Sequence, residues 1–325
     1  MSSTIEPISQ PVIDELKMFN QRFRYMLKSD VFLLNLITCY ILKTKGKQLR
    51  PTLVMLAAKM FGEIGEKTHT AAALIELLHI TSLVHDDVVD EANERRGFFS
   101  IHALWNSKTA VLFGDYLLAQ GLILSVNNQA FDLLHIVAVA VKEMCEGELL
   151  QLEHSRKQNI TRDEYFEIIR KKTAALIAAC VEAGAQSSGA TPEQIARMRQ
   201  FGIYLGMIFQ IKDDLLDYRT AGITGKAAGN DLKEKKYTLP LIYVLEQSLP
   251  RERKRIIETV NSEKPFAEKM QLITHLIAEY KGVDHCYAVM DDLGKKAIAM
   301  LDTLPQNEAS AMLVKAVSYV TKREK

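Results

Sequence analysis

The sequence predicts an all-α protein, a single-domain helical bundle, and three features of its composition indicate this class. No proline occurs between Pro51 and Pro192, so nothing there forces a helix to end. Glycine is sparse, and the Asn-Gly and Asp-Gly pairs typical of tight hairpins are absent. The commonest residues, among them Ala, Leu, Glu, Lys and Met, favour helices. Because no repeat or linker divides the 325 residues, we expect one domain over residues 1–325.

Start signals and apolar periodicity predict the positions of the helices. Pro51 suits the first turn of one helix, and Thr161 and Thr191 each begin a helix-capping sequence. Further prolines interrupt a helical C-terminal third, and we expect a loop rich in glycine and lysine over 219–237. The ranges expected to be helical before that loop are 11–29, 31–42, 51–61, 70–90, 109–126, 131–154, 161–187 and 191–218.

Composition excludes several classes of protein. The formal net charge of +1 argues against a nucleic-acid partner. No run approaches the roughly 18 consecutive apolar residues of a membrane span, and residues 1–11 lack the pattern of a secretory signal. The four cysteines, Cys39, Cys145, Cys180 and Cys286, are scattered, as expected for reduced thiols. We therefore expect a cytoplasmic protein.

An acidic sequence follows the apolar segment 71–84. On a helix, Asp86 and Asp90 lie one turn apart on the same face, and Asp87 lies one position round. Carboxylates crowded at the end of an apolar helix need cations, and a set of oxygen ligands suits Mg2+ where a phosphate completes the shell. Arg95 and Arg96 follow and offer forked donors for phosphate oxygens. One isolated copy of this pattern is better explained as a solvated helix end.

A second copy of the same spacing favours a metal site over a solvated helix end. Asp213, Asp214 and Asp217 repeat it, again after an apolar run, at 201–209. Two such helix ends can face each other across one cavity and hold a small metal cluster between them. The repeat therefore predicts one Mg2+ site that binds a diphosphate between the two acidic sequences.

Several cations lie near the first acidic sequence. Lys47 and Arg50 are three residues apart just before a helix, and His79 lies seven residues before Asp86 on nearly the same helix face. Each has an ordinary alternative, which is a solvated basic turn for the pair and a packed core histidine for His79. Together with Arg96, they would complete a second phosphate pocket.

Three lysines are candidates of the same kind. Lys172 occurs in an alanine-rich helical segment, where a surface side chain is the ordinary interpretation. Lys226 and Lys236 belong to the loop after the second acidic sequence, which could fold over a substrate phosphate and exclude water. By itself, that loop is an ordinary surface loop.

Taken in order, these motifs resemble those of the trans-type isoprenyl diphosphate synthases, the polyprenyl synthetase family. The resemblance covers almost the whole chain. The segments that carry it are 46–51 (Gly-Lys-Gln-Leu-Arg-Pro), His79, 86–97, 114–118 (Gly-Asp-Tyr-Leu-Leu), Lys172-Thr173, Phe209-Gln210 with 213–217, Lys226, and 236–240 (Lys-Tyr-Thr-Leu-Pro). The departures are small, because Lys45 and Lys235 stand where the family pattern commonly has glycine.

The resemblance implies an isoprenoid-synthase fold, all-α around a deep central cavity, and a homodimer. It also implies the Mg2+-dependent, head-to-tail condensation of isopentenyl diphosphate with an allylic diphosphate. The residues implied to bind Mg2+ are Asp86, Asp90 and Asp213, supported by Asp87, Asp214 and Asp217. The residues implied to contact the allylic diphosphate are Arg95, Lys172, Lys226 and Lys236. The residues implied to hold isopentenyl diphosphate are Lys47, Arg50, His79 and Arg96.

Ionisation of the allylic substrate would leave a carbocation, which favours dipoles over nucleophiles. Thr173 and Gln210 would offer oxygens to this cation, while Lys172 helps to neutralise the leaving diphosphate. In the family, the released diphosphate removes the proton, so no side-chain base is expected. The product would pass to membrane enzymes.

The residues one turn below Asp86 predict the length of the product. Thr81 and Ser82 stand where short-chain members of the family often carry an aromatic ring. Both are small here, and Leu78, another turn down, is apolar. We therefore expect a product longer than a twenty-carbon chain, of the kind used for quinone side chains. If an aromatic side chain from elsewhere, such as Phe113, closed the tunnel, the chain would instead be a short-chain synthase.

Two further alternatives are less well supported by the sequence. A terpene cyclase of the same fold class would typically mix Asn, Ser or Thr with Glu in its second metal motif, whereas both motifs here are built from aspartates. A non-catalytic partner subunit would be expected to lack one of the two acidic sequences. We therefore expect an active prenyltransferase.

Overall fold

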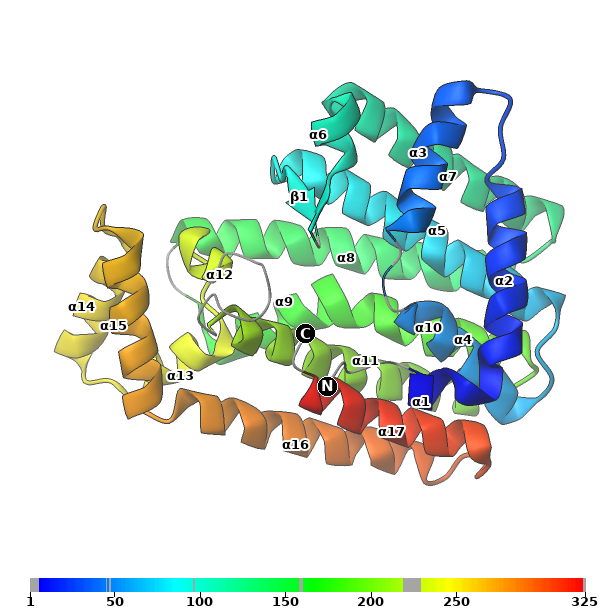
Figure 1. The fold of residues 1–325 in the computed structure, drawn as a ribbon. Helices are drawn as coiled ribbons and strands as arrows, with labels where there is room; N and C mark the ends of the chain where they lie inside the picture. The colour runs from blue at the N-terminus through cyan, green and yellow to red at the C-terminus, as the bar shows by residue number, and fades with distance from the viewer. Residues whose placement is uncertain are drawn as a thin grey trace.

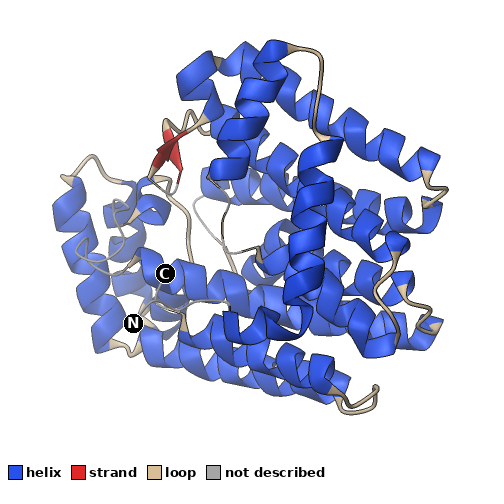
Figure 2. Ribbon diagram, turned by 45° about the vertical axis from the view of Figure 1, so that its right-hand side comes forward, coloured by secondary structure: helices blue, strands red, loops and turns tan. Residues whose placement is uncertain are grey.

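A computed structural model of the chain confirms the all-α class; it describes residues 6–44, 46, 48–95, 97–157, 160–218 and 229–323. Helices make up nearly all of its regular structure (Figures 1 and 2). Over these ranges the only strands are β1 (Glu94–Arg95) and β2 (Phe98–Phe99), which pair antiparallel. The sequence gives little signal for this hairpin, because each strand has only two residues.

The N-terminal half is built on three long helices, α5, α7 and α8. The bounds in this half are α1 (Glu6–Ser9), η1 (Gln10–Val12), α2 (Ile13–Met26), α3 (Phe32–Lys43), α4 (Leu49–Phe61), α5 (Glu66–Val89), α6 (Ile101–Trp105), α7 (Ser107–Asn127) and α8 (Phe131–Lys157). The three long helices match the expected ranges to within a few residues at each end, which is the usual uncertainty of helix boundaries.

The C-terminal half begins with a helix that is interrupted. The bounds are α9 (Arg162–Ile169), a π-helical segment labelled η2 (Arg170–Ala174), α10 (Ala175–Ser187), α11 (Pro192–Asp217), α12 (Asn230–Lys233), α13 (Leu239–Gln247), α14 (Pro250–Asn261), α15 (Phe266–Glu279), α16 (Gly282–Leu301) and α17 (Glu308–Lys322). The prolines of this half stand at or near helix starts, as expected. Of the loop expected over 219–237, the structure describes 229–237, which includes α12.

The prediction of one regular helix over 161–187 is wrong at the π-helical segment. Two glycines bring neighbouring helices against this segment. A Cβ atom at Gly147 of α8 would lie 2.5 Å from the Lys172 backbone nitrogen, and one at Gly206 of α11 would lie 2.4 Å from the Ala174 Cα. Only glycine allows so close an approach. Single π turns occur frequently at functional sites, and this one carries two of the predicted site residues, Lys172 and Thr173.

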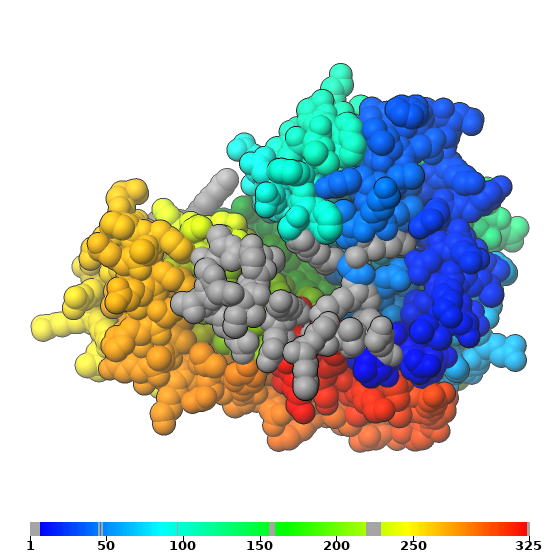
Figure 3. Space-filling model, in the orientation of Figure 1, coloured from blue at the N-terminus to red at the C-terminus, as the bar shows by residue number. Residues whose placement is uncertain are grey.

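The core of the molecule lies around α10. This helix is buried along nearly its whole length and is rich in alanine, so α4 and α11 pack closely on either side of it. Helix α16 packs against α11, and α17 packs against both α4 and α11, along the lower edge of the bundle in Figure 1. In the space-filling view, a notch separates the part of the molecule with α3, β1 and α6 from helices α14 and α15 (Figure 3).

Helix α7 is apolar on both of its faces. Of the helices that the structure describes, it alone is long and apolar enough to cross a membrane. This is a weak indication, because core helices of globular proteins pass the same test. One face of α7 packs against α5. The apolar side chains that its other face exposes are Val111, Leu112, Leu118, Leu122, Ile123 and Val126.

Candidate active site

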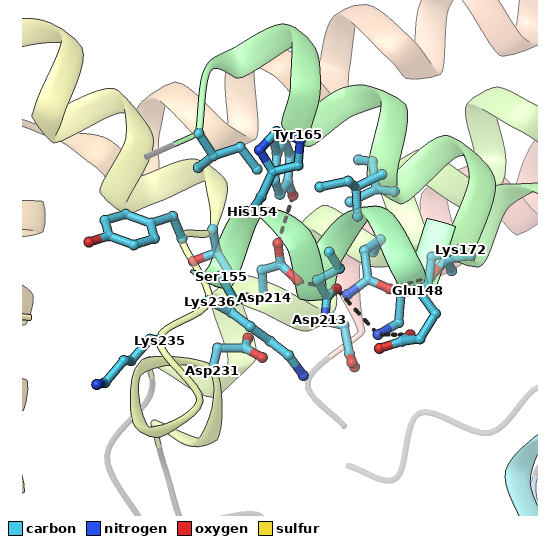
Figure 4. Close-up of a pocket in the computed structure, with 18 of the residues that line it drawn as sticks. Glu148, His154, Ser155, Tyr165, Lys172, Asp213, Asp214, Asp231, Lys235 and Lys236 are labelled. Carbon is cyan, nitrogen blue, oxygen red and sulfur yellow. Dashed lines mark hydrogen bonds and ion pairs between the residues drawn. The ribbon is translucent and has the colours of Figure 1, made fainter. Parts of the chain in front are cut away.

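A cavity of about 330 Å3 lies where the C-terminal ends of α5, α8 and α11 meet. This volume is typical of a small-molecule site. Figure 4 shows side chains from α8, α9, α11 and the segment 231–236 gathered around it. Both acidic sequences contribute to its wall, with Asp86 and Asp90 from the end of α5 and Asp213 and Asp214 from α11. The two acidic sequences therefore lie on one cavity.

In the first acidic sequence, two of the three carboxylates open onto this cavity. Asp86 is accessible to water, but the cavity walls partly desolvate it. This burial, followed by the nearby Glu148 carboxylate, raises the pKa of Asp86 to about 6. Burial also raises the pKa of Asp90. Asp87 instead is buried, accepts a hydrogen bond from Arg95 Nε at 2.7 Å, and lines a different pocket.

In the second acidic sequence, the first and last carboxylates have separate partners. The Asp213 side chain is 49% exposed and accepts a hydrogen bond from Arg323 Nη2 at 3.1 Å. The Arg323 guanidinium also lies over the Phe209 ring, 3.8 Å from its centroid. Asp217 accepts the backbone N–H groups of Asn230 and Asp231, at 3.2 and 2.9 Å, and so holds the first turn of α12. Asp217 thus acts in the structure as a cap.

The middle carboxylate, Asp214, belongs to a chain of hydrogen bonds. It accepts one from Tyr165 Oη at 2.6 Å and one from Gln210 Nε2 at 2.8 Å. Gln210 Oε1 in turn accepts a hydrogen bond from Thr173 Oγ1 at 2.6 Å. Burial, and then the neighbouring Asp231 carboxylate, raise the pKa of Asp214 more than these two donors lower it. Thr173 and Gln210, predicted to act together, are therefore in direct contact on the cavity wall.

The donors on this cavity fit a hard divalent cation. Six carboxylates line it against four lysine and arginine side chains, so negative charge there is in excess. A cation, the Arg323 guanidinium, already contacts Asp213. Across the described ranges, no three His, Cys, Asp or Glu side chains lie close enough together to hold an ion by themselves. An ion here would need further oxygens, which a bound diphosphate supplies.

Of the cations predicted to contact the allylic diphosphate, three line the cavity. Lys172 Nζ forms an ion pair with Glu148 at 2.5 Å and donates to Gln151 Oε1 at 3.2 Å. Lys236 pairs with Glu234, and Arg95 lines this cavity as well as the neighbouring pocket. The fourth predicted cation, Lys226, lies outside the described residues.

The neighbouring pocket, smaller than the cavity, contains part of the second predicted phosphate site. Its wall includes His79 and Arg95, and Arg50 Nη1 lies 2.8 Å from His79 Nε2. The structure therefore brings Arg50 and His79 together, although they are far apart in the sequence. Lys47 and Arg96, the other two residues predicted for this site, lie outside the described residues.

The three residues predicted to control product length line neither the cavity nor the neighbouring pocket. Thr81 is buried and its hydroxyl donates to the Gly114 carbonyl at 3.4 Å, so it faces α7. Ser82 is half-buried and donates to the carbonyl of His79 in its own helix. Leu78 is half-buried and packs against the core. Phe113, the aromatic residue considered as a block, is buried in the core and lines neither pocket.

The sequence alone did not reveal four residues of this site. Glu148 and Asp231 add carboxylates to the cavity wall, Tyr165 donates to Asp214, and Arg323 contacts Asp213. Only Glu148 has a local signal, because Glu146-Gly147-Glu148 interrupts an apolar helix. The other three meet the acidic sequences through packing, and no spacing in the sequence indicates it.

Comparisons with known proteins agree with this geometry. The family model for polyprenyl synthetases matches residues 32–277. Heptaprenyl diphosphate synthase component 2 from Geobacillus stearothermophilus is 36% identical over 96% of each chain, and the short chain isoprenyl diphosphate synthase from Methanothermobacter thermautotrophicus is 33% identical over 88% of this chain and 89% of its own. The crystal structure of a polyprenyl synthase from Caulobacter crescentus, complexed with calcium and isoprenyl diphosphate, is 33% identical, has a TM-score of 0.91 and covers 100% of this chain and 99% of its own.

Proposed function

Because the chain belongs to the polyprenyl synthetase family and is a trans-prenyltransferase, we propose that this cavity condenses isopentenyl diphosphate head-to-tail with an allylic diphosphate. One observation carries the proposal: two acidic sequences, 127 residues apart from Asp86 to Asp213, line one cavity together with Lys172 and the Thr173–Gln210 pair. A diphosphate and a cationic carbon could both be stabilised there.

The charge of each residue on the cavity indicates the role that we propose for it. Asp86, Asp90 and Asp213 are the carboxylates placed to bind Mg2+, which would neutralise the diphosphate as its bond to carbon breaks. Arg95, Lys172 and Lys236, with Lys226, would hold that diphosphate through charge-assisted hydrogen bonds. The hydroxyl of Thr173 and the amide oxygen of Gln210 face the region where the allylic cation would form.

The neighbouring pocket would bind the second substrate. Arg50 and His79 lie in contact there, and Lys47 and Arg96 complete the set that we propose for isopentenyl diphosphate. Arg95 lines both pockets, so the two diphosphates would lie on either side of its guanidinium. Such an arrangement brings the two reacting carbons together, which replaces an encounter in solution by a preset geometry.

We propose a long-chain product that feeds quinone side chains. Thr81 and Ser82, one turn below Asp86, are small and leave room for a growing chain, and the aromatic residue Phe113 lines neither pocket. A relative of the chain is named for a heptaprenyl product. A short-chain synthase remains the second candidate function, because another relative carries that name.

We also propose that the protein is a cytoplasmic homodimer and that the exposed apolar stripe of α7 lies in its interface. Six apolar side chains between 41% and 58% exposed follow one face of this helix. An apolar surface of this kind is covered by a partner in a stable protein. The product, an apolar chain with a charged head, would pass from the dimer to membrane enzymes.

The deciding experiment is turnover by the purified chain alone, with farnesyl diphosphate, excess radiolabelled isopentenyl diphosphate and Mg2+. We expect products longer than a twenty-carbon chain on chromatography, and loss of turnover with EDTA that Mg2+ reverses. Products that stop at twenty carbons, after one condensation, would identify a short-chain synthase. A cyclic hydrocarbon would identify a cyclase, and no product at all would indicate a non-catalytic partner subunit.

Two variants test the finer parts of the proposal. Ser82→Phe should shorten the product while the first condensation continues, whereas Ser82→Ala, which keeps the residue small, should leave the product unchanged. For the dimer, sedimentation should give twice the chain mass of 36.7 kDa, and Leu122→Glu should shift it to the monomer. A monomeric wild-type chain would disprove this interface.

A further inference from the structure

The middle aspartate of the second acidic sequence has both carboxylate oxygens engaged by side chains of the protein. Asp214 is 4% exposed. Its Oδ2 accepts a hydrogen bond from the hydroxyl of Tyr165 (Figure 4). Its Oδ1 accepts one from Nε2 of Gln210. Tyr165 is itself 3% exposed. A carboxylate that already accepts two short hydrogen bonds in a buried place is a poor candidate for a metal ligand.

This arrangement determines the orientation of the Gln210 side-chain amide. A side-chain amide has a donor end and an acceptor end, and the two are similar in shape. Both oxygens of Asp214 accept hydrogen bonds here, one from Tyr165 and one from Gln210, as those of an ionised carboxylate do. A carboxylate held in this way requires the NH2 end of Gln210 to face it. The amide oxygen is then turned to the other side, where it accepts the Thr173 hydroxyl at 2.6 Å.

The orientation of this amide matters for the reaction. With the observed orientation, two oxygens, Thr173 Oγ1 and Gln210 Oε1, lie together on the cavity wall. With the opposite orientation, an NH2 group would stand in their place. Oxygens stabilise a developing carbocation, whereas the positive end of an amide dipole destabilises it. A buried network that fixes one orientation supplies this stabilisation without reorganisation during the reaction.

We propose that Asp214 and Tyr165 are positioning residues that fix the polarity of the Gln210 amide, so that its oxygen faces the reacting carbon. Tyr165 holds the carboxylate and the carboxylate orients the amide, while Gln210 and Thr173 are the groups that touch the substrate. The inference rests on the proposed function of the cavity. It assigns Asp214 a role different from that of Asp86, Asp90 and Asp213.

The sharpest test replaces Asp214 with the amide of the same shape. In Asp214→Asn, the Tyr165 hydroxyl still finds an oxygen, and the new NH2 group then faces Gln210. Gln210 should turn over, presenting its own NH2 group to the cavity. We expect kcat to fall about 100-fold or more, with the Michaelis constant for the allylic diphosphate within about twofold. Calorimetry of Mg2+ with inorganic diphosphate should give the same affinity as for the wild type.

A double-mutant cycle separates orientation from a direct role. Gln210→Met removes the amide and keeps the volume, so Asp214→Asn added to it should cause little further loss of kcat. Losses that multiply in the double variant, or a weaker affinity for Mg2+ and inorganic diphosphate in Asp214→Asn, would overturn the inference and make Asp214 a metal ligand.

Tyr165→Phe tests the other end of the network. It should lower kcat about tenfold, with the allylic Michaelis constant and the Mg2+ requirement unchanged, because Asp214 loses one of its two anchors. Tyr218→Phe is the matched control. The hydroxyl of Tyr218 contacts Thr238 Oγ1 at 2.8 Å and neither of the two pockets includes this residue. Equal losses in the two variants would contradict the inference.

These outcomes are distinguishable from failure of the proposed function. If the cavity did not perform the condensation, the unchanged chain would make no product, and both proposals would fall. If only the inference were wrong, the wild type would turn over normally and the cycle would be additive. Circular dichroism and melting temperatures of each variant show whether a loss reflects unfolding.

Discussion

The two acidic sequences share the pattern Asp-Asp-x-x-Asp, but the residues that surround their carboxylates in the structure differ. In the first, Asp86 and Asp90 open onto the cavity, and only Asp87 is turned away to Arg95. In the second, Asp213 contacts Arg323, and the other two carboxylates are committed to Tyr165, Gln210 and the start of α12. Equal spacing on a helix therefore places carboxylates on equal faces, but the neighbouring helices decide what each carboxylate does.

The largest expected effect separates two neighbours in the first acidic sequence. Asp86→Asn should lower kcat by about a thousandfold or more, because it removes a carboxylate placed to bind Mg2+. Asp87→Asn should cost less, about tenfold to a hundredfold, because Asp87 acts through Arg95. Steady-state kinetics at saturating Mg2+ measures both. Equal losses would show that the two carboxylates are equivalent despite their different surroundings.

The last aspartates of the two acidic sequences, Asp90 and Asp217, should also differ in their effect on kcat. Asp90→Asn should lower kcat about a hundredfold. Asp217→Asn should leave it within about threefold, since the single Asn side-chain oxygen can still accept one of the two N–H groups at the start of α12. Asp217→Ala, which cannot, should lower the free energy of unfolding by about 1 kcal/mol, as measured in urea. A hundredfold loss of kcat in Asp217→Asn would instead support the metal role predicted for this residue.

Arg323 provides a smaller effect that is specific to the second acidic sequence. Its guanidinium contacts Asp213 where an ion would bind, so the two cations compete for one oxygen. Arg323→Gln should therefore lower the Mg2+ concentration for half-maximal activity about two- to fivefold, as expected for a partly exposed ion pair. Titration of activity with Mg2+ gives this value, and Lys322→Gln, on the adjacent residue, is the control. An unchanged or higher Mg2+ requirement would argue against competition.

The smallest expected effect is on stability, and it should be alike for Asp86 and Asp231, two carboxylates of the cavity. The pKa values of Asp86 and Asp231 are about 6, above the unfolded value of about 3.9. Between these values the folded protein binds more protons than the unfolded chain, so its stability falls as the pH rises from about 4 to about 6. In EDTA, Asp86→Asn or Asp231→Asn should therefore raise the melting temperature at pH 7.5 and have little effect near pH 4. A gain at low pH instead would reverse the sign of this argument.

Much of the molecule follows from local sequence. The helical class, the ranges of the long helices and the positions of both acidic sequences depend on composition, capping residues and spacing, and these act over a few residues. The resemblance to the polyprenyl synthetases, rather than any local pattern, implied that Thr173 and Gln210 act on one substrate, and in the structure the two side chains are in contact. The π-helical segment escaped prediction, because the alanine-rich segment after it is buried on all sides, and a shift in the phase of its apolar pattern therefore leaves no clear signal.

The sequence by itself determined which residue types are available to the site and on which helices they lie. Tertiary structure decided the partner of each one: Arg95 for Asp87, Tyr165 and Gln210 for Asp214, Arg323 for Asp213, and the added carboxylates Glu148 and Asp231. The physical reason is that a hydrogen bond or an ion pair depends on distances of a few ångströms. Such distances between residues far apart in the chain are set by helix packing, including the close approach at Gly147 and Gly206.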